Sequence, residues 1–150
     1  MRSKFLWVVV LAAVAAAGTS VGQERKDAGG DVLRQIQGTW KFVSQEVDGK
    51  PRTKDELAKQ TITFEGDKWT VRRDGKVIQA GTHKFAPDKK PPQVDAVVTE
   101  GEDKGNTMLG IYELKGDTLR VCFDPNGKKR PTDFASKEGR MTAVVERQKK

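Results

Sequence analysis

The sequence predicts an all-β fold, an antiparallel up-and-down barrel of about eight strands with a short helical turn before the first strand and a short helix after it. Two observations lead to this class. Short runs of alternating apolar and polar side chains recur along the chain, as in strands with one buried face. Tight-turn pairs such as Gly66-Asp67 and Asp74-Gly75 separate them, which is typical of hairpins. Such strands form a sandwich or a barrel, and closure favours the barrel because it removes exposed edges.

The first elements follow from local pattern. Residues 32–37 are predicted to form a helical turn with Leu33 and Ile36 on one face and Asp31 as its cap. Residues 39–47 then alternate as a first strand.

Later elements carry equally local signals. Thr53, with Glu56 three residues on, makes a capping-box pattern that predicts a helix ending near Lys59. Residues 76–85 are long for a strand, and Gly81 within them predicts a bulge or bend. The other strands are predicted at residues 61–65, 68–72, 94–98, 107–114, 118–123 and 141–147.

The chain divides into a leader and one domain. Residues 1–22 have the basic start, apolar run and small residues of a secretory signal peptide. The apolar run is about 13 residues, shorter than the ~20 that span a bilayer, so no transmembrane segment is expected after cleavage. Residues 23–30 read as a flexible lead-in, and residues 31–148 as the barrel domain. We therefore expect an exported protein, periplasmic or secreted.

Charge and cysteine content narrow the classes of function. The formal charge of +7 would fall to about +5 on loss of Arg2 and Lys4, which suits acidic partners. Lysines and arginines alternate with acidic residues for most of the chain instead of forming a dense stripe, which argues against nucleic-acid binding. The single cysteine, Cys122, excludes an intramolecular disulfide, and its strand-like setting suggests a half-buried structural thiol.

Candidate catalytic and metal sites are sparse. A zinc site or a Cys-His nucleophile pair would need His83 and Cys122, the only residues of their types. Glu100, Glu102 and Asp103 share a loop but lack the spacing of a calcium loop. Hydrolase, metalloprotease and phosphate-loop motifs are missing from the sequence. We therefore expect a protein that is not an enzyme and that holds neither metal nor cofactor.

Several strand positions could face an internal ligand. Small eight-stranded barrels either hold one modest ligand or fill with side chains, and the sequence leaves both open. The residues that would line such an interior are Trp69, His83, Phe85, Met108 and Tyr112.

The pattern around the first and last strands resembles the lipocalin layout. A short helical turn precedes Gly38-Thr39-Trp40, and Arg147 lies in the last strand. In lipocalins the tryptophan packs at the closed end of the barrel beneath a basic residue, so the resemblance implies a structural anchor of Gly38, Trp40 and Arg147. The lipocalin Thr-Asp-Tyr motif between the sixth and seventh strands is not evident in this sequence, and its nearest analogue is Lys115-Gly116-Asp117.

Four segments carry a more specific resemblance, to a family of small exported lipocalin-like domains abundant in planctomycete bacteria. The resemblance covers most of residues 33–147 and implies a fold and an exported location, without a particular activity. The segments are Gln37-Gly38-Thr39-Trp40, Val47-Asp48-Gly49-Lys50-Pro51, Leu109-Gly110-Ile111-Tyr112-Glu113-Leu114 and Arg130-Pro131-Thr132-Asp133-Phe134-Ala135-Ser136-Lys137.

Three functions remain in competition, one of them an enzyme with its site inside the barrel near His83. The first is a non-enzymatic binder of a small apolar or amphipathic molecule in the barrel mouth. The second is an envelope interaction module that recognises an acidic polymer or a protein through the loops with Lys89-Lys90 and Lys128-Lys129-Arg130.

Overall fold

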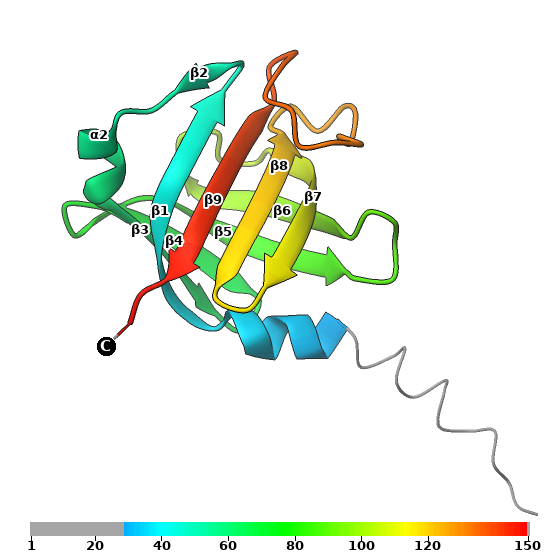
Figure 1. Cartoon of the computed structure of the whole chain (residues 1–150), viewed down its shortest axis with the longest axis horizontal. Coiled ribbons are helices and arrows are strands. Elements are labelled where there is room, and N and C mark those ends of the chain that lie inside the picture. The colour runs from blue at the N-terminus through cyan, green and yellow to red at the C-terminus, as the bar shows by residue number, and fades with distance from the viewer. Residues whose placement is uncertain (1–28, 150) are drawn as a thin grey trace, which may run out of the picture.

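The computed structural model describes residues 29–149, so the predicted signal peptide and most of the predicted lead-in lie outside the described residues. Nine strands and α2 (Lys54–Ala58) follow a helix at residues 29–36 (Figure 1). The strands are β1 (Gly38–Val47), β2 (Lys50–Pro51), β3 (Gln60–Glu65), β4 (Lys68–Arg73), β5 (Lys76–Ala86), β6 (Gln93–Gly101), β7 (Thr107–Lys115), β8 (Thr118–Asp124) and β9 (Met141–Arg147).

The strands close into an antiparallel barrel, which confirms the predicted class. Consecutive strands from β3 to β9 pair with one another, and β1 pairs with both β3 and β9. Eight strands therefore form the wall, while the two-residue β2 folds back and pairs only with the end of β1. The register of β1 with β9 shifts between Phe42 and Ser44, which marks a β-bulge in this strand.

The bend predicted at Gly81 is also confirmed. The register between β5 and β6 shifts between Ala80 and Gly81. A Cβ atom at Gly81 would lie 1.9 Å from the carbonyl oxygen of Val97 and 2.8 Å from Cζ2 of Trp69. Only glycine lets the Trp69 ring and the neighbouring backbone approach this closely.

The N-terminal helix begins earlier than the sequence suggested. Gly29 and Gly30 are already helical, so Asp31 lies inside the helix and pairs with Arg34 instead of capping it. Val32 and Ile36, one turn apart, are the buried residues. The helix covers one end of the barrel, which we call the helix end (Figure 1).

α2 follows its predicted pattern. The Thr53 side chain accepts from the backbone N–H of Glu56, and the Glu56 carboxylate accepts from the N–H of Thr53, so the capping box is present. Leu57 is the buried residue of this helix. Within residues 29–149, helices fall short of the length and apolar character that crossing a membrane requires.

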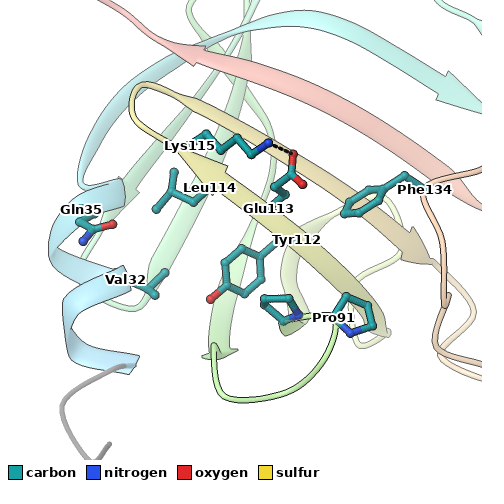
Figure 2. Close-up of a pocket in the computed structure, with 9 residues that line it drawn as sticks. Val32, Gln35, Pro91, Tyr112, Glu113, Leu114, Lys115 and Phe134 are labelled. Carbon is teal, nitrogen blue, oxygen red and sulfur yellow. Dashed lines mark ion pairs between the residues drawn. The ribbon is translucent and has the colours of Figure 1, made fainter. Parts of the chain in front are cut away.

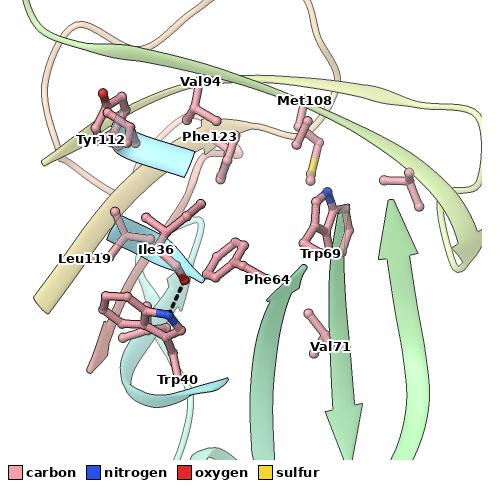
Figure 3. Close-up of a cluster of buried hydrophobic side chains, with 14 residues drawn as sticks. Ile36, Trp40, Phe64, Trp69, Val71, Val94, Met108, Tyr112, Leu119 and Phe123 are labelled. Atoms are coloured by element: carbon pink, nitrogen blue, oxygen red, sulfur yellow. Dashed lines mark hydrogen bonds between the residues drawn. The ribbon is translucent and has the colours of Figure 1, made fainter. Parts of the chain in front are cut away.

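Buried side chains from β1, β3, β4 and β6 to β9 fill the centre of the barrel (Figure 3), and β5 adds the partly buried Ile78 and Phe85. Ile36 of the N-terminal helix projects into this core beside Trp40, Phe64 and Leu119 (Figure 3). The other buried members are Val32, Trp69, Val71, Val94, Ala96, Val98, Met108, Tyr112, Phe123 and Val145. The centre therefore resembles a packed core more than an open calyx.

The connection from β8 to β9 forms a second layer outside the barrel. Asp124 organises its start by accepting from the backbone N–H groups of Asn126, Lys128 and Lys129. Under this layer Cys122 is 0% exposed, with its thiol directed at the carbonyl oxygen of Ala135. Cys122 is thus fully buried, not half-buried as predicted, because this loop covers the outward face of β8. Burial raises the pKa of its thiol.

Candidate functional site

A clamp around Trp40 fixes the helix end. The indole N–H of Trp40 donates to the carbonyl oxygen of Ile36 at 2.8 Å, and the guanidinium of Arg147 lies 4.4 Å from the Trp40 ring centroid. Arg147 also donates to the carbonyl oxygens of Gln35 and Gln37 and to the carboxylate of Asp117. These bonds satisfy carbonyls at the end of the helix and hold it against the barrel.

Gly38 lies between these partners. Its φ of +113° is a conformation that side chains rarely adopt, and a Cβ atom there would lie 3.6 Å from Nη1 of Arg147. Gly38 therefore lets the chain turn from the helix into β1 directly beside Trp40 and Arg147. Asp117, in the turn between β7 and β8, completes the clamp by accepting a hydrogen bond from Arg147. Asp117 belongs to Lys115-Gly116-Asp117, the nearest analogue of the Thr-Asp-Tyr motif in this sequence.

A series of aromatic rings runs from this clamp across the core. Trp40, Phe64, His83, Phe85 and Tyr112 contact one another in that order, with centroid separations of 6.3, 5.5, 4.9 and 4.9 Å. Every pair meets edge to face, the arrangement that ring quadrupoles favour. The series crosses from β1 and β3 to β5 and β7 and joins opposite walls of the barrel.

His83 is the polar member of the series. Its side chain is 8% exposed, and neither Nδ1 nor Nε2 has a hydrogen-bond partner among the described residues. Burial lowers the pKa of the imidazole below its ordinary 6.5, although the backbone of His83 itself and, to a smaller extent, the Asp67 carboxylate oppose this effect. At neutral pH His83 is therefore uncharged and offers one donor and one acceptor.

A hollow of about 660 Å³ opens beside His83. It forms where β4 begins: Lys68, the first residue of β4, pairs with Thr82, and β5 continues past this point to Ala86. The backbone N–H of His83 donates to the carbonyl oxygen of Asp67 at this corner. The lining residues are Gly29, Leu33, Asp67, Thr82, His83, Lys84, Phe85, Asp95, Val97 and Thr107, and most of the lining surface is apolar.

A smaller hollow of about 430 Å³ lies on the other side of the N-terminal helix. Figure 2 shows Val32 on the helix and Tyr112 and Leu114 on β7 turned toward one another across it. Burial, with Asp88 nearby, raises the pKa of Tyr112 to about 12, so its hydroxyl keeps its proton at neutral pH. Pro91, Pro92 and Phe134 complete the apolar lining, with Gln35, Glu113 and Lys115 at its polar edge.

The five interior residues chosen from the sequence divide into two groups. His83 and Phe85 line the larger hollow, and Tyr112 lines the smaller one. Trp69 and Met108 belong to the packed core and line neither hollow, because Trp69 packs beneath Gly81 and donates to the carbonyl oxygen of Thr82. Both hollows border the N-terminal helix, so the candidate site is at the helix end of the barrel. This is the end that the lipocalin resemblance predicts to be closed.

Sequence reasoning missed the residues that complete the two hollows. Leu33, Val32 and the Pro91-Pro92 pair carry no chemical signal of their own, and they reach the site only through the folding of the helix and the β5–β6 loop against the barrel. The one signal in the sequence was the amphipathic pattern of the helix, which predicts that its apolar face packs against the barrel.

The Cys-His and metal alternatives find no geometric support. His83 is buried inside the barrel against Phe64 and Phe85, whereas Cys122 is on the outward side of β8 beneath the β8–β9 loop. Among residues 29–149, no three His, Cys, Asp or Glu side chains are grouped closely enough to hold a metal ion.

The fold and site together define a closed eight-stranded antiparallel barrel with apolar hollows at one end, consistent with a lipocalin-like barrel. Comparisons with models of protein families, with curated proteins and with solved structures found no match for this chain.

Proposed function

We propose that this chain is a non-enzymatic binding module for a small apolar or amphipathic molecule, held at the helix end of the barrel beside β5. We also propose that it is exported and related to the small lipocalin-like domains that its sequence resembles. We place the site at the helix end because side chains fill the centre of the barrel and leave less room there for a ligand.

The observation that carries the proposal is the environment of His83. A polar side chain that is 8% exposed and lacks partners among the described residues is costly, and most such groups in proteins are satisfied. This imidazole borders a mostly apolar hollow of about 660 Å³, within the size range of small-molecule sites. A ligand with an apolar body would fill the hollow beside the imidazole.

Fluorescence titration with N-phenyl-1-naphthylamine, an uncharged apolar probe, tests the proposal. We expect saturable binding to the wild-type chain and at least tenfold weaker binding to Leu33→Lys, which places a charge in the larger hollow. Leu114→Lys is the matched control, because Leu114 is also a half-buried leucine but lines the smaller hollow. Thermal melting verifies that both variants fold.

Two results would reject this site. Absence of saturable probe binding would remove the binding function, and equal affinity of Leu33→Lys and wild type would remove the larger hollow as its place. Native mass spectrometry of the protein isolated from its own source complements the titration by showing whether a small molecule copurifies.

A second candidate function is supported by the two basic loops. Pro91, Pro92 and Phe134 line one hollow, so the loops with Lys89-Lys90 and Lys128-Lys129 meet on the same side of the barrel. These four lysines are exposed, whereas Arg130 is engaged with Asp95 and with the carbonyl oxygens of Val94 and Gly110. Binding of an acidic polymer or protein here should weaken as salt rises to physiological strength, and salt-independent binding would exclude it.

A further inference from the structure

We infer that the smaller hollow is a second binding site for an uncharged ligand with an apolar body and a carbonyl group, to which the hydroxyl group of Tyr112 donates. This hollow lies on the other side of the N-terminal helix from the larger one and shares no lining residue with it. Three features of the hollow support the inference: the unpaired hydroxyl group, the surroundings that act against charge beside it, and the fixed apolar walls.

The hydroxyl group of Tyr112 lacks a partner but can be reached from the hollow. The residue is 3% exposed, and its hydroxyl forms no hydrogen bond with the described residues. The fully enclosed side-chain oxygen and nitrogen atoms that lack a partner in residues 29–149 belong to other residues, so the Tyr112 oxygen keeps accessible surface. Figure 2 shows this oxygen in the space between Val32 and Pro91. A ligand in the smaller hollow can therefore meet a polar group that the protein leaves unpaired.

The surroundings of this hydroxyl group favour an uncharged acceptor. Burial and the carboxylate of Asp88 raise the pKa of Tyr112 to about 12, because both act against a negative charge on its oxygen. A ligand carboxylate beside the hydroxyl would meet the same two effects. The charged side chains of the lining pair with each other, since Nζ of Lys115 lies 3.7 Å from Oε1 of Glu113. A carbonyl oxygen avoids the cost of burying a charge and accepts from the hydroxyl, which keeps its proton at neutral pH.

Contacts around the smaller hollow hold its walls in place. The backbone N–H of Tyr112 donates to the carbonyl oxygen of Pro92 at 3.0 Å, which fixes the β5–β6 loop against β7. The guanidinium of Arg120 lies 4.4 Å from the ring centroid of Phe134 and holds that ring of the β8–β9 loop. The Tyr112 ring packs edge to face on Phe85, with the centroids 4.9 Å apart. Walls that are already fixed need little ordering when a ligand enters, which favours binding.

Tyr112 makes the inference testable because it is the only tyrosine of the chain. The ¹³Cζ resonance of labelled tyrosine in the full chain therefore reports this hydroxyl group alone. The probes are 2-acetylnaphthalene, 2-isopropylnaphthalene, naphthalene-2-carboxylate and 2-naphthylmethylammonium, which share a ring system and differ in one substituent. A hollow of about 430 Å³ is within the size range of small-molecule sites. At pH 7 we expect 2-acetylnaphthalene to bind about fivefold more tightly than the other three and to shift the ¹³Cζ resonance.

Tyr112→Phe removes the hydroxyl group and keeps the ring that packs on Phe85. We expect this variant to bind 2-acetylnaphthalene and 2-isopropylnaphthalene with equal affinity. Leu114→Lys places a charge in the same hollow and should weaken binding of 2-acetylnaphthalene about tenfold. Val77→Lys is the matched control for the added charge, because Val77 is 48% exposed and lines neither hollow. The ¹³Cζ shift in the wild-type chain is an independent measurement if Tyr112→Phe folds poorly.

Each contrary result removes a specific part of the inference. Equal wild-type affinities for 2-acetylnaphthalene and 2-isopropylnaphthalene, without a ¹³Cζ shift, would overturn carbonyl recognition by Tyr112. Tightest binding of either charged probe would overturn the uncharged class, and unchanged binding by Leu114→Lys would remove the smaller hollow as the site. Failure of all four probes to bind would overturn the inference as a whole. The proposed function is tested separately, since Leu33→Lys and N-phenyl-1-naphthylamine report on the larger hollow.

Discussion

The guanidinium of Arg147 lies over the Trp40 ring, 4.4 Å from its centroid, while donating to the carbonyl oxygens of Gln35 and Gln37. One side chain of the last strand thus joins the first strand to the N-terminal helix. Since both hollows border that helix, the same contact that closes the barrel also sets the walls of the candidate site.

Arg147→Lys should lower the free energy of unfolding by about 1–3 kcal/mol, because lysine keeps the charge but loses the planar group that stacks on Trp40 and reaches two carbonyls. Urea denaturation followed by tryptophan fluorescence measures the change. Arg34→Lys is the control, since Arg34 forms an exposed pair with Asp31 and should change stability by no more than about 0.5 kcal/mol. Equal effects of the two substitutions would contradict the clamp.

Trp40→Ala should destabilise the barrel by roughly 3–5 kcal/mol, because Trp40 is 0% exposed and its removal leaves a large cavity and an unpaired carbonyl at Ile36. Val43→Ala, at a half-exposed position of the same strand, should stay within about 0.5 kcal/mol of wild type. Chemical denaturation distinguishes the two. A Trp40→Ala variant of full stability would show that this residue is not the anchor.

Gly81→Ala should cost several times more than Gly75→Ala. The new Cβ atom at position 81 would meet the Val97 carbonyl oxygen at 1.9 Å and the Trp69 ring at 2.8 Å, so backbone or ring must move. At Gly75 the space is open and only the φ of +80° is strained, a cost of about 1 kcal/mol. Comparison of melting temperatures tests the order, and the reverse order would be incompatible with the bend at Gly81.

Asp124 should make the fold sensitive to acid. Burial raises the pKa of its carboxyl, but three backbone N–H donors and nearby Arg140 outweigh this effect and hold the pKa below its ordinary 3.8. A carboxyl with a lowered folded-state pKa contributes stability above the unfolded pKa, and this contribution is lost as pH falls through the folded value. The stability advantage of wild type over Asp124→Asn should therefore be constant from pH 7 to about 5 and shrink below about pH 4.

Urea titrations of both proteins at several pH values measure this difference. An advantage that persists undiminished at pH 2 would mean that ionisation of Asp124 does not stabilise the β8–β9 loop.

His83 should add a second acid sensitivity at higher pH. Because burial lowers its pKa in the folded state, the unfolded chain binds the proton first as pH falls below 6.5. Stability from the neutral imidazole is present above that value and declines on acidification toward the folded-state pKa. Wild type should lose stability between about pH 7 and 5 relative to His83→Phe, and NMR titration of the single imidazole should give a pKa below 6.5. A higher measured pKa would contradict the buried neutral state.

Local patterns in the sequence were enough to define the strands and the class of fold. Alternation marked every wall strand, turn pairs such as Asp74-Gly75 marked the hairpins, and the Thr53–Glu56 capping box marked α2. These features depend on residues close together in the chain, so periodicity and turn chemistry suffice to find them. The start of the N-terminal helix was misjudged because Gly29 and Gly30 are poor helix formers, and packing on the barrel overrides that preference.

Tertiary structure alone decided where a ligand could bind. His83, Phe85 and Tyr112 were recognisable as inward-facing from alternation, but Trp69 and Met108 had the same pattern and line neither hollow. The difference arises because β5 runs past the first residue of β4 and the N-terminal helix packs beside that corner, which leaves the larger hollow at His83. Strand lengths and helix placement are set by contacts between distant segments, so sequence periodicity determines which way a side chain points and packing determines whether space remains in front of it.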